Sequence, residues 1–148
     1  MISGSILYVE DDEDDVLLLK MAFKRAGITN PLEAVIDGSQ AIDYLAGTGQ
    51  YADRQRYPLP GLVMLDLNLP RRSGLEVLAW MRQQPALRRI VAIVFTSGLD
   101  AREVKRAYDL GVNSFIAKPV DLEDRIKMAQ ELKAWWLDRN HVPRVDGE

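Results

Sequence analysis

The sequence predicts a doubly wound α/β domain, in which helices cover both faces of a five-stranded parallel sheet. Five short apolar runs alternate along the chain with segments of helical periodicity, which is the pattern of repeated strand–helix units. Several of these runs lack polar alternation, as strands do when both of their faces are buried. The expected strands cover residues 5–9, 32–35, 62–65, 90–95 and 114–117.

Five helices complete these units, and capping residues mark several of their ends. The first helix is expected to close on Gly27, a residue type suited to a left-handed C-terminal cap. Ser73, with a glutamate three residues later, has the spacing of a capping box at the start of the third helix. Asp100 opens the fourth helix, and Asp121 caps the fifth, which should reach about residue 137.

Composition favours a single soluble domain. The chain has 148 residues with 47% hydrophobic content, enough for one full core. Its net charge of −3 implies no basic surface for nucleic acid, and the absence of cysteine excludes thiol catalysis and zinc–thiolate sites. No secretory signal or membrane-spanning stretch is present. We therefore expect a cytoplasmic domain over residues 1–139, followed by a polar tail over residues 140–148, with no membrane partner.

The segment of residues 47–60 is longer than a minimal connection. It contains two prolines, two tyrosines and the arginines Arg54 and Arg56. Surface loops tolerate insertions at little cost, so this segment is expected to be a surface excursion. Contact with a partner protein is the weaker alternative.

Charged and hydroxyl side chains follow the ends of four expected strands. Asp66 comes directly after one apolar run. A carboxylate at such a position loses hydration, and this cost must be offset by a hydrogen-bonded or charged partner. Glu10 and Asp11 follow the first strand, Thr96 lies at the end of the fourth, and Lys118 lies at the end of the fifth. The carboxyl ends of parallel strands lie at one edge of the sheet, where open α/β folds bind their ligands.

The acidic residues at this edge indicate a cation site. Adjacent strand ends lie about 5 Å apart, so Glu10 and Asp11 are expected to converge on Asp66. Three carboxylates repel one another unless a divalent cation joins them, and an oxygen-only ligand set favours Mg²⁺ or Mn²⁺ over zinc. The neighbouring Asp14 and Asp15 are interpreted as first-turn acids that favour the helix dipole.

This set of groups suits phosphoryl transfer. A metal ion, the ammonium of Lys118, and the hydroxyl of Thr96 with a backbone N–H would each neutralise one oxygen of the transferring group. Asp66 would be the nucleophile and would form an acyl phosphate. The alternative is that Lys118 is only a structural counter-ion to the acids.

Together these residues resemble the receiver domain of two-component response regulators. The resemblance rests on Glu10-Asp11, Asp66, Thr96-Ser97 and Lys118-Pro119, in this order at four strand ends, and it covers the chain to about residue 137. It implies a flavodoxin-like fold with strand order 2-1-3-4-5. It also implies that a histidine kinase transfers a phosphoryl group to Asp66, so that the protein accepts phosphate rather than acting as an enzyme on a substrate.

The resemblance further assigns the metal ligands. It implies that Asp11 and Asp66 bind Mg²⁺ directly, that the backbone carbonyl of Asn68 completes the protein ligands, and that Glu10 acts through water.

For the conformational switch, the resemblance implies that Thr96 works with the aromatic residue Phe115. It also implies a cis peptide bond between Lys118 and Pro119.

A narrower resemblance concerns partners. The segment of residues 66–70, the long loop and the tryptophan-bearing last helix look like single-domain regulators that partner bacterial phytochromes. We expect no effector domain, and we therefore expect the output to be a protein–protein contact. Met128 and Trp135 lie off the apolar stripe of the last helix and are the expected contacts of a homodimer through that helix. The alternative is that Trp135 folds over the helix end against the core. The stripe itself comprises Leu122, Ile126, Ala129, Leu132 and Trp136.

Three rival functions share parts of this pattern. An aspartyl-phosphate phosphatase of the haloacid-dehalogenase type has a similar nucleophile and metal, but it requires a second aspartate where this chain has Asn68. A flavodoxin-like electron carrier would need a phosphate loop at residues 10–15, which are all acidic. A nucleotide-binding switch is excluded because the chain has no glycine-rich loop with lysine and serine or threonine.

Overall fold

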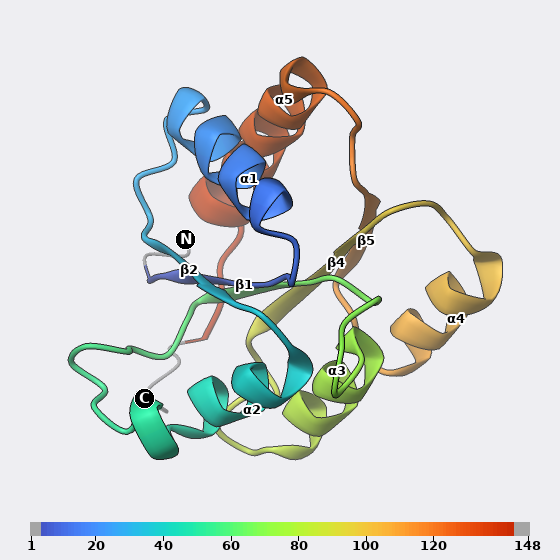
Figure 1. Ribbon diagram of the computed structural model, residues 1–148. Helices are drawn as coiled ribbons and strands as arrows, with labels where there is room; N and C mark the ends of the chain where they lie inside the picture. The colour runs from blue at the N-terminus through green and yellow to red at the C-terminus, as the bar shows by residue number, and fades with distance from the viewer. Residues whose placement is uncertain (1–3, 144–148) are drawn as a thin grey trace.

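The computed structural model describes residues 4–143, and it has the predicted doubly wound architecture (Figure 1). Five parallel strands form one sheet in the order β2-β1-β3-β4-β5, which confirms the expected strand order. In register, Val9 is paired with Leu65, and Thr96 with Ala117, so the residues after these strands emerge at one edge. The strands are β1 (Ile6–Val9), β2 (Leu32–Val35), β3 (Leu62–Leu65), β4 (Val91–Thr96) and β5 (Ser114–Ala117).

Helices cover both faces of the sheet (Figure 1). The helices α1 (Glu13–Arg25) and α5 (Leu122–Leu132) lie together on one face, and α2 (Gly38–Ala46), α3 (Gly74–Gln83) and α4 (Ala101–Asp109) lie on the other. Alternate residues of each strand enter two separate hydrophobic clusters, because successive side chains of a strand point to opposite faces. No helix within residues 4–143 is long and apolar enough to cross a membrane.

The predicted caps hold the helix ends that border the carboxyl edge of the sheet. The side chains of Ser73, Asp100 and Asp121 each accept a hydrogen bond from a backbone N–H in the first turn of α3, α4 and α5. The N-terminal cap of α1 is Asp12, whose Oδ1 accepts from the N–H of Asp14 at 2.9 Å. Because Asp12 caps the helix, the side chain of Asp15 is available for other contacts.

The long connection between α2 and β3 runs over the surface, as expected, with most of its residues exposed, but it is anchored at Tyr51 and Arg54. Its short helix η1 (Gly49–Tyr51) buries Tyr51 against Tyr44 of α2, with ring centroids 5.0 Å apart. The guanidinium of Arg54 donates hydrogen bonds to the backbone carbonyls of Tyr44 and Leu45, both at 2.7 Å, and of Tyr57 at 3.2 Å. The carbonyls of Tyr44 and Leu45 lie in the last turn of α2, where a cation and extra donors are favourable.

Replacing Arg54 with alanine is expected to lower the free energy of unfolding by about 2 kcal/mol, because three charge-assisted hydrogen bonds are lost and their acceptors are left unsatisfied. Urea denaturation followed by circular dichroism measures this loss. Arg89→Ala, at an exposed arginine, is the matched control and should change stability by less than about 0.5 kcal/mol. Equal effects of the two substitutions would contradict the anchoring role.

The last helix differs from the expectation in two respects, at Met128 and after Leu132. Met128 is only 9% exposed and belongs to the hydrophobic cluster beneath α1 and α5, so its assignment as an interface residue is wrong. The buried face of α5 is rotated toward α1 and includes Arg125 and Leu132. After Leu132 the chain continues as the π-helix η2 (Lys133–Arg139), whose wider turns return Leu137 to the core. Trp135 is consequently 61% exposed and does not fold against the core.

Candidate functional site

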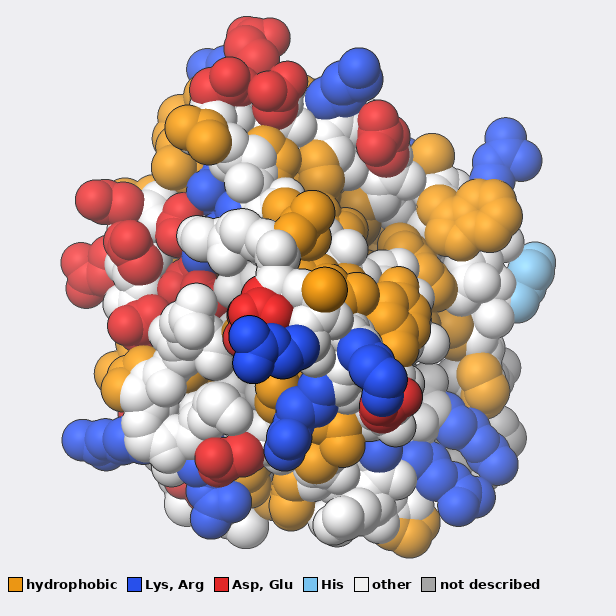
Figure 2. Space-filling model, turned by 90° about the vertical axis from the view of Figure 1, so that its right-hand side faces the viewer, with side chains coloured by type: hydrophobic (Ala, Val, Ile, Leu, Met, Phe, Trp, Pro, Cys, Tyr) orange, Lys and Arg blue, Asp and Glu red, His pale blue; other side chains and the backbone are white. Residues whose placement is uncertain are grey.

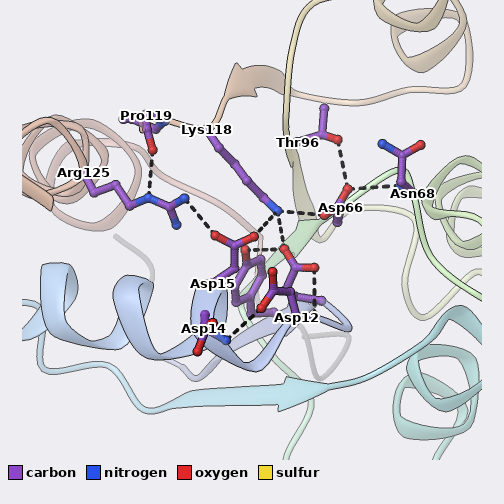
Figure 3. A network of polar contacts seen from close by, with 11 residues as sticks. Asp12, Asp14, Asp15, Asp66, Asn68, Thr96, Lys118, Pro119 and Arg125 are labelled. Atoms are coloured by element: carbon purple, nitrogen blue, oxygen red, sulfur yellow. Dashed lines mark hydrogen bonds and ion pairs between the residues drawn. The ribbon is translucent and has the colours of Figure 1, made fainter. Parts of the chain in front are cut away.

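Side chains from four strand ends and from α1 meet at the carboxyl edge of the sheet (Figure 3). Asp66, which follows β3, is 6% exposed. Its Oδ1 accepts from the hydroxyl of Thr96 at 2.9 Å and from the backbone N–H of Asn68 at 3.0 Å, and its Oδ2 accepts from Nζ of Lys118 at 2.8 Å. The structure thus brings together the predicted nucleophile, hydroxyl and ammonium.

Lys118 is the centre of the charge network. Its buried ammonium donates to Asp66, to Glu10 and, at 2.9 Å, to Oδ2 of Asp15. An ammonium has three donors, so these three carboxylates engage all of them. Burial alone would lower the pKa of Lys118, but the hydrogen bonds to the three carboxylates raise it above its ordinary value. Lys118 therefore stays protonated.

The two buried carboxyls that share this lysine have different proton affinities. Burial raises the pKa of Glu10 to about 7, and the nearby charge of Asp66 adds to the increase. Burial would also raise the pKa of Asp66, but hydrogen bonds from Lys118 and from the N–H of Asn68 hold it below its ordinary value. This difference in pKa indicates which carboxyl group acts as the nucleophile, because only an ionised carboxylate is nucleophilic. Asp66 is that group.

Asp15 and Arg125 belong to the same network, which their positions in the sequence did not predict. Oδ1 of Asp15 accepts from Nη2 of Arg125 at 2.8 Å, while its Oδ2 accepts from Lys118 (Figure 3). Arg125 is 4% exposed, and its Nε donates to the carbonyl of Pro119 at 2.9 Å. A sequence signal for Arg125 exists, since it lies three residues after Leu122 on the core-facing side of α5. A buried cation at such a position requires a buried anion.

Asp11 is exposed beside this network, and its expected convergence on Asp66 with Glu10 stays a prediction. It borders a surface hollow of about 290 Å³ that also touches Glu10 and Glu13. Within the described residues 4–143, no three acidic or histidine side chains are arranged to hold a metal ion.

Two glycines fix the backbone of the loop that follows Asp66. A Cβ on Gly74 would lie 2.1 Å from the carbonyl oxygen of Asp66, and a Cβ on Gly38 would lie 2.1 Å from the carbonyl oxygen of Arg72. No other residue type permits such close backbone approach. The starts of α2 and α3 therefore clamp the loop from both ends and set the direction of the Asp66 side chain.

Phe115 lies on β5, paired in register with Val94, and is half-buried. Together with Tyr108 and Leu99 it borders an open hollow of about 530 Å³ beside α4. Hydrophobic side chains lie among acidic and basic ones on the face that Figure 2 shows. The role of Phe115 in a switch with Thr96 stays a prediction.

The expected cis bond before Pro119 is wrong, because residues 4–143 contain no cis peptide bond. Most X–Pro bonds favour the trans form by about 0.5–1 kcal/mol.

Comparison of the sequence with known proteins identifies the family. Residues 6–130 match the response regulator receiver domain. The chain is 37% identical over 138 residues to the response regulator Rcp1 of Synechocystis sp., covering 93% of this chain and 92% of Rcp1. It is 38% identical over 141 residues to the probable methanogenesis regulatory protein FilR2 of Methanothrix harundinacea, covering 93% of this chain and 86% of FilR2.

Solved structures agree with this match. The phosphorylated cyanobacterial phytochrome response regulator RcpA has a TM-score of 0.88 and 31% identity, and the match covers 97% of this chain and 100% of RcpA. The Mn²⁺-bound form of Rcp1 has a TM-score of 0.85 and 36% identity, and the match covers 96% of this chain and 100% of the Rcp1 chain. These matches give no support to a phosphatase of the haloacid-dehalogenase type. The chain therefore belongs to the response regulator receiver domain family of two-component signalling.

Proposed function

We propose that Asp66 is the phosphoacceptor of this receiver domain and that its phosphorylation by a histidine kinase switches protein–protein contacts. The observation that carries the proposal is the Asp66 carboxylate itself, which is ionised and held by Thr96 and Asn68 on one oxygen and by Lys118 on the other. An Asp66 oxygen attacks the phosphorus of a phosphohistidine. The phosphorus–nitrogen bond breaks, and the imidazole nitrogen leaves with the electron pair and takes up a proton.

Thr96 and Lys118 then bind the new phosphoryl oxygens. Both already donate to Asp66, at 2.9 Å and 2.8 Å, so a short movement of each side chain suffices. Movement of Thr96 would leave space for Phe115, whose ring lies at the border of the hollow beside α4. The face formed by α4 and β5 would change shape as a result.

The site also suits a divalent cation, Mg²⁺ or Mn²⁺, which when bound neutralises charge on the transferring phosphoryl group. The protein ligands would be Asp11, Asp66 and the backbone carbonyl of Asn68, with Glu10 acting through water. All of these donors are oxygens, as these ions prefer. Asp11 is exposed at the edge of the site, where it can turn toward an entering ion. The relative Rcp1 has a Mn²⁺-bound form, which supports a divalent cation as the bound metal.

The test is the intact mass of the protein after exposure to acetyl phosphate and MgCl₂. We expect one phosphoryl adduct on the native chain, none on Asp66→Asn, and none when EDTA replaces the metal. Asp53→Asn, in the exposed loop, is the matched control and should form the adduct normally. An adduct that persists in Asp66→Asn would contradict the assignment. The decay of the adduct after removal of acetyl phosphate measures autodephosphorylation.

The kinase partner we propose is a sensor of the bacterial phytochrome type, because the similar structure RcpA is a phytochrome response regulator. Phosphotransfer to this chain should be faster from a phosphorylated phytochrome kinase than from an unrelated histidine kinase.

A homodimer through the last helix is the interface we propose, with Trp135 as its anchor. Trp135 is 61% exposed on η2, and a large exposed aromatic ring is a frequent contact residue at interfaces. Trp135→Ala should shift the sedimentation-velocity profile toward the monomer. Tyr108→Ala, which removes another half-exposed aromatic ring on α4, is the control and should leave the profile unchanged. A native chain that sediments as a monomer at all concentrations would overturn the dimer.

A further inference from the structure

Asp15 connects the site at the sheet edge to α5. One of its carboxylate oxygens accepts from Lys118 at 2.9 Å, and the other accepts from Arg125 at 2.8 Å (Figure 3). Arg125 in turn holds the carbonyl of Pro119, the residue next to Lys118, at 2.9 Å. The result is a closed ring of contacts between α1, α5 and the end of β5.

A phosphoryl group on Asp66 would require this ring to change. The three donors of Lys118 are engaged by Asp66, Glu10 and Asp15. When the ammonium moves from the Asp66 oxygen to a phosphoryl oxygen beyond it, its contacts with Glu10 and Asp15 oppose the movement. Glu10 has no other cationic partner among residues 4–143, and it is almost fully buried. Asp15 is less buried and already has a second cation, Arg125. Of these two carboxylates, Asp15 is therefore the one whose release from Lys118 is less unfavourable.

Arg125 has a spare donor for the released carboxylate. Its Nη1 is buried and has no hydrogen-bond partner in the described part of the chain, although Nε and Nη2 are both engaged. A buried donor without an acceptor is unfavourable. A carboxylate that leaves Lys118 can place both oxygens on the two Nη groups, which is the bidentate geometry that guanidinium groups favour.

We propose that Asp15 is a positioning residue, which restrains Lys118 while Asp66 is unphosphorylated and passes to Arg125 when Lys118 binds the phosphoryl group. The proposal rests on the phosphoacceptor role of Asp66. It gives Arg125 a specific task, which is to make the release of Lys118 favourable. It also carries the phosphorylation signal to α5 by a route separate from Thr96 and Phe115.

The test compares binding of beryllofluoride, a phosphoryl mimic, in the presence of MgCl₂, with the bound fraction measured by fluorine NMR. Asp15→Asn removes the competing charge from Lys118 and should tighten binding at least about fivefold. Arg125→Gln leaves Asp15 with Lys118 alone and should weaken binding by at least about fivefold. Arg125→Lys keeps the positive charge but lacks the bidentate guanidinium, so its affinity should lie between those of Arg125→Gln and the native chain.

The two substitutions are expected to change beryllofluoride affinity in opposite directions. This distinguishes the proposed role from a structural one, because loss of a purely structural ion pair would weaken binding in both variants. In the Asp15→Asn background, Arg125→Gln should have no further effect. Asp109→Asn, which removes the same charge from an exposed ion pair on α4, is the control and should leave the affinity unchanged. Unchanged or weakened binding in folded Asp15→Asn overturns the proposal. Absence of binding to the native chain, or persistent binding to Asp66→Asn, would instead overturn the phosphoacceptor role.

Discussion

Replacing Lys118 with methionine is expected to lower the free energy of unfolding by about 3 kcal/mol near neutral pH. Methionine retains most of the hydrocarbon volume of the side chain, so the change removes mainly the buried positive charge. Glu10, Asp15 and Asp66 then lose the ammonium that all three contact. Two of these carboxylates are almost fully buried, and their mutual repulsion becomes uncompensated.

Urea denaturation measures the effect of Lys118→Met. The matched control is Lys105→Met, because Lys105 pairs with Asp109 at 3.0 Å on the exposed surface of α4. An exposed pair of this kind contributes less than about 0.5 kcal/mol. If Lys118→Met is no more destabilising than Lys105→Met, the buried charge network does not stabilise the fold.

The stability of the metal-free protein is expected to fall by roughly 3 kcal/mol as the pH rises from about 4.5 to above 7. Burial raises the pKa of Glu10 from its ordinary 4.5 to about 7. Between these values the folded state holds a proton that the unfolded state has lost. This contribution is therefore fully present below 4.5 and is lost as the pH rises through about 7. Asp15 and Asp66 have lowered pKa values, so their contributions are lost only in acid, below 3.8.

Urea denaturation at a series of pH values, in buffer containing EDTA, tests this dependence. Glu10→Gln should remove most of the pH dependence of the unfolding free energy between pH 4.5 and 7, because glutamine does not titrate. Glu13→Gln, at an exposed position of α1, should keep this pH dependence. A native protein whose stability rises over this range would contradict the environment described for Glu10.

The fold was predictable because its signals are local. Each strand is a short apolar run, and the caps at Ser73, Asp100 and Asp121 are set by residues within one helical turn. The strand-end placement of Asp66, Thr96 and Lys118 followed from the same strands, since parallel strands bring their carboxyl ends to one edge.

What was missed depends on how helices pack, which spacing along one segment does not determine. The first-turn position of Asp15 was explained by the helix dipole, but the packing of α1 beside α5 places it between Lys118 and Arg125. Similarly, the π-helix η2 changes the helical phase after Leu132, and the face of α5 toward α1 buries Met128. The one available signal was Arg125, a charged residue three positions after Leu122, on the side of α5 that faces the core.

The most direct measurement of the central claim is the position of the phosphoryl group. Borohydride reduces an aspartyl phosphate to homoserine, so peptide mapping after treatment with acetyl phosphate, MgCl₂ and borohydride identifies the modified residue. We predict homoserine at Asp66, and none in a sample that was not phosphorylated. Homoserine at Asp11 or Asp15, with Asp66 unmodified, would contradict the assignment of the phosphoacceptor.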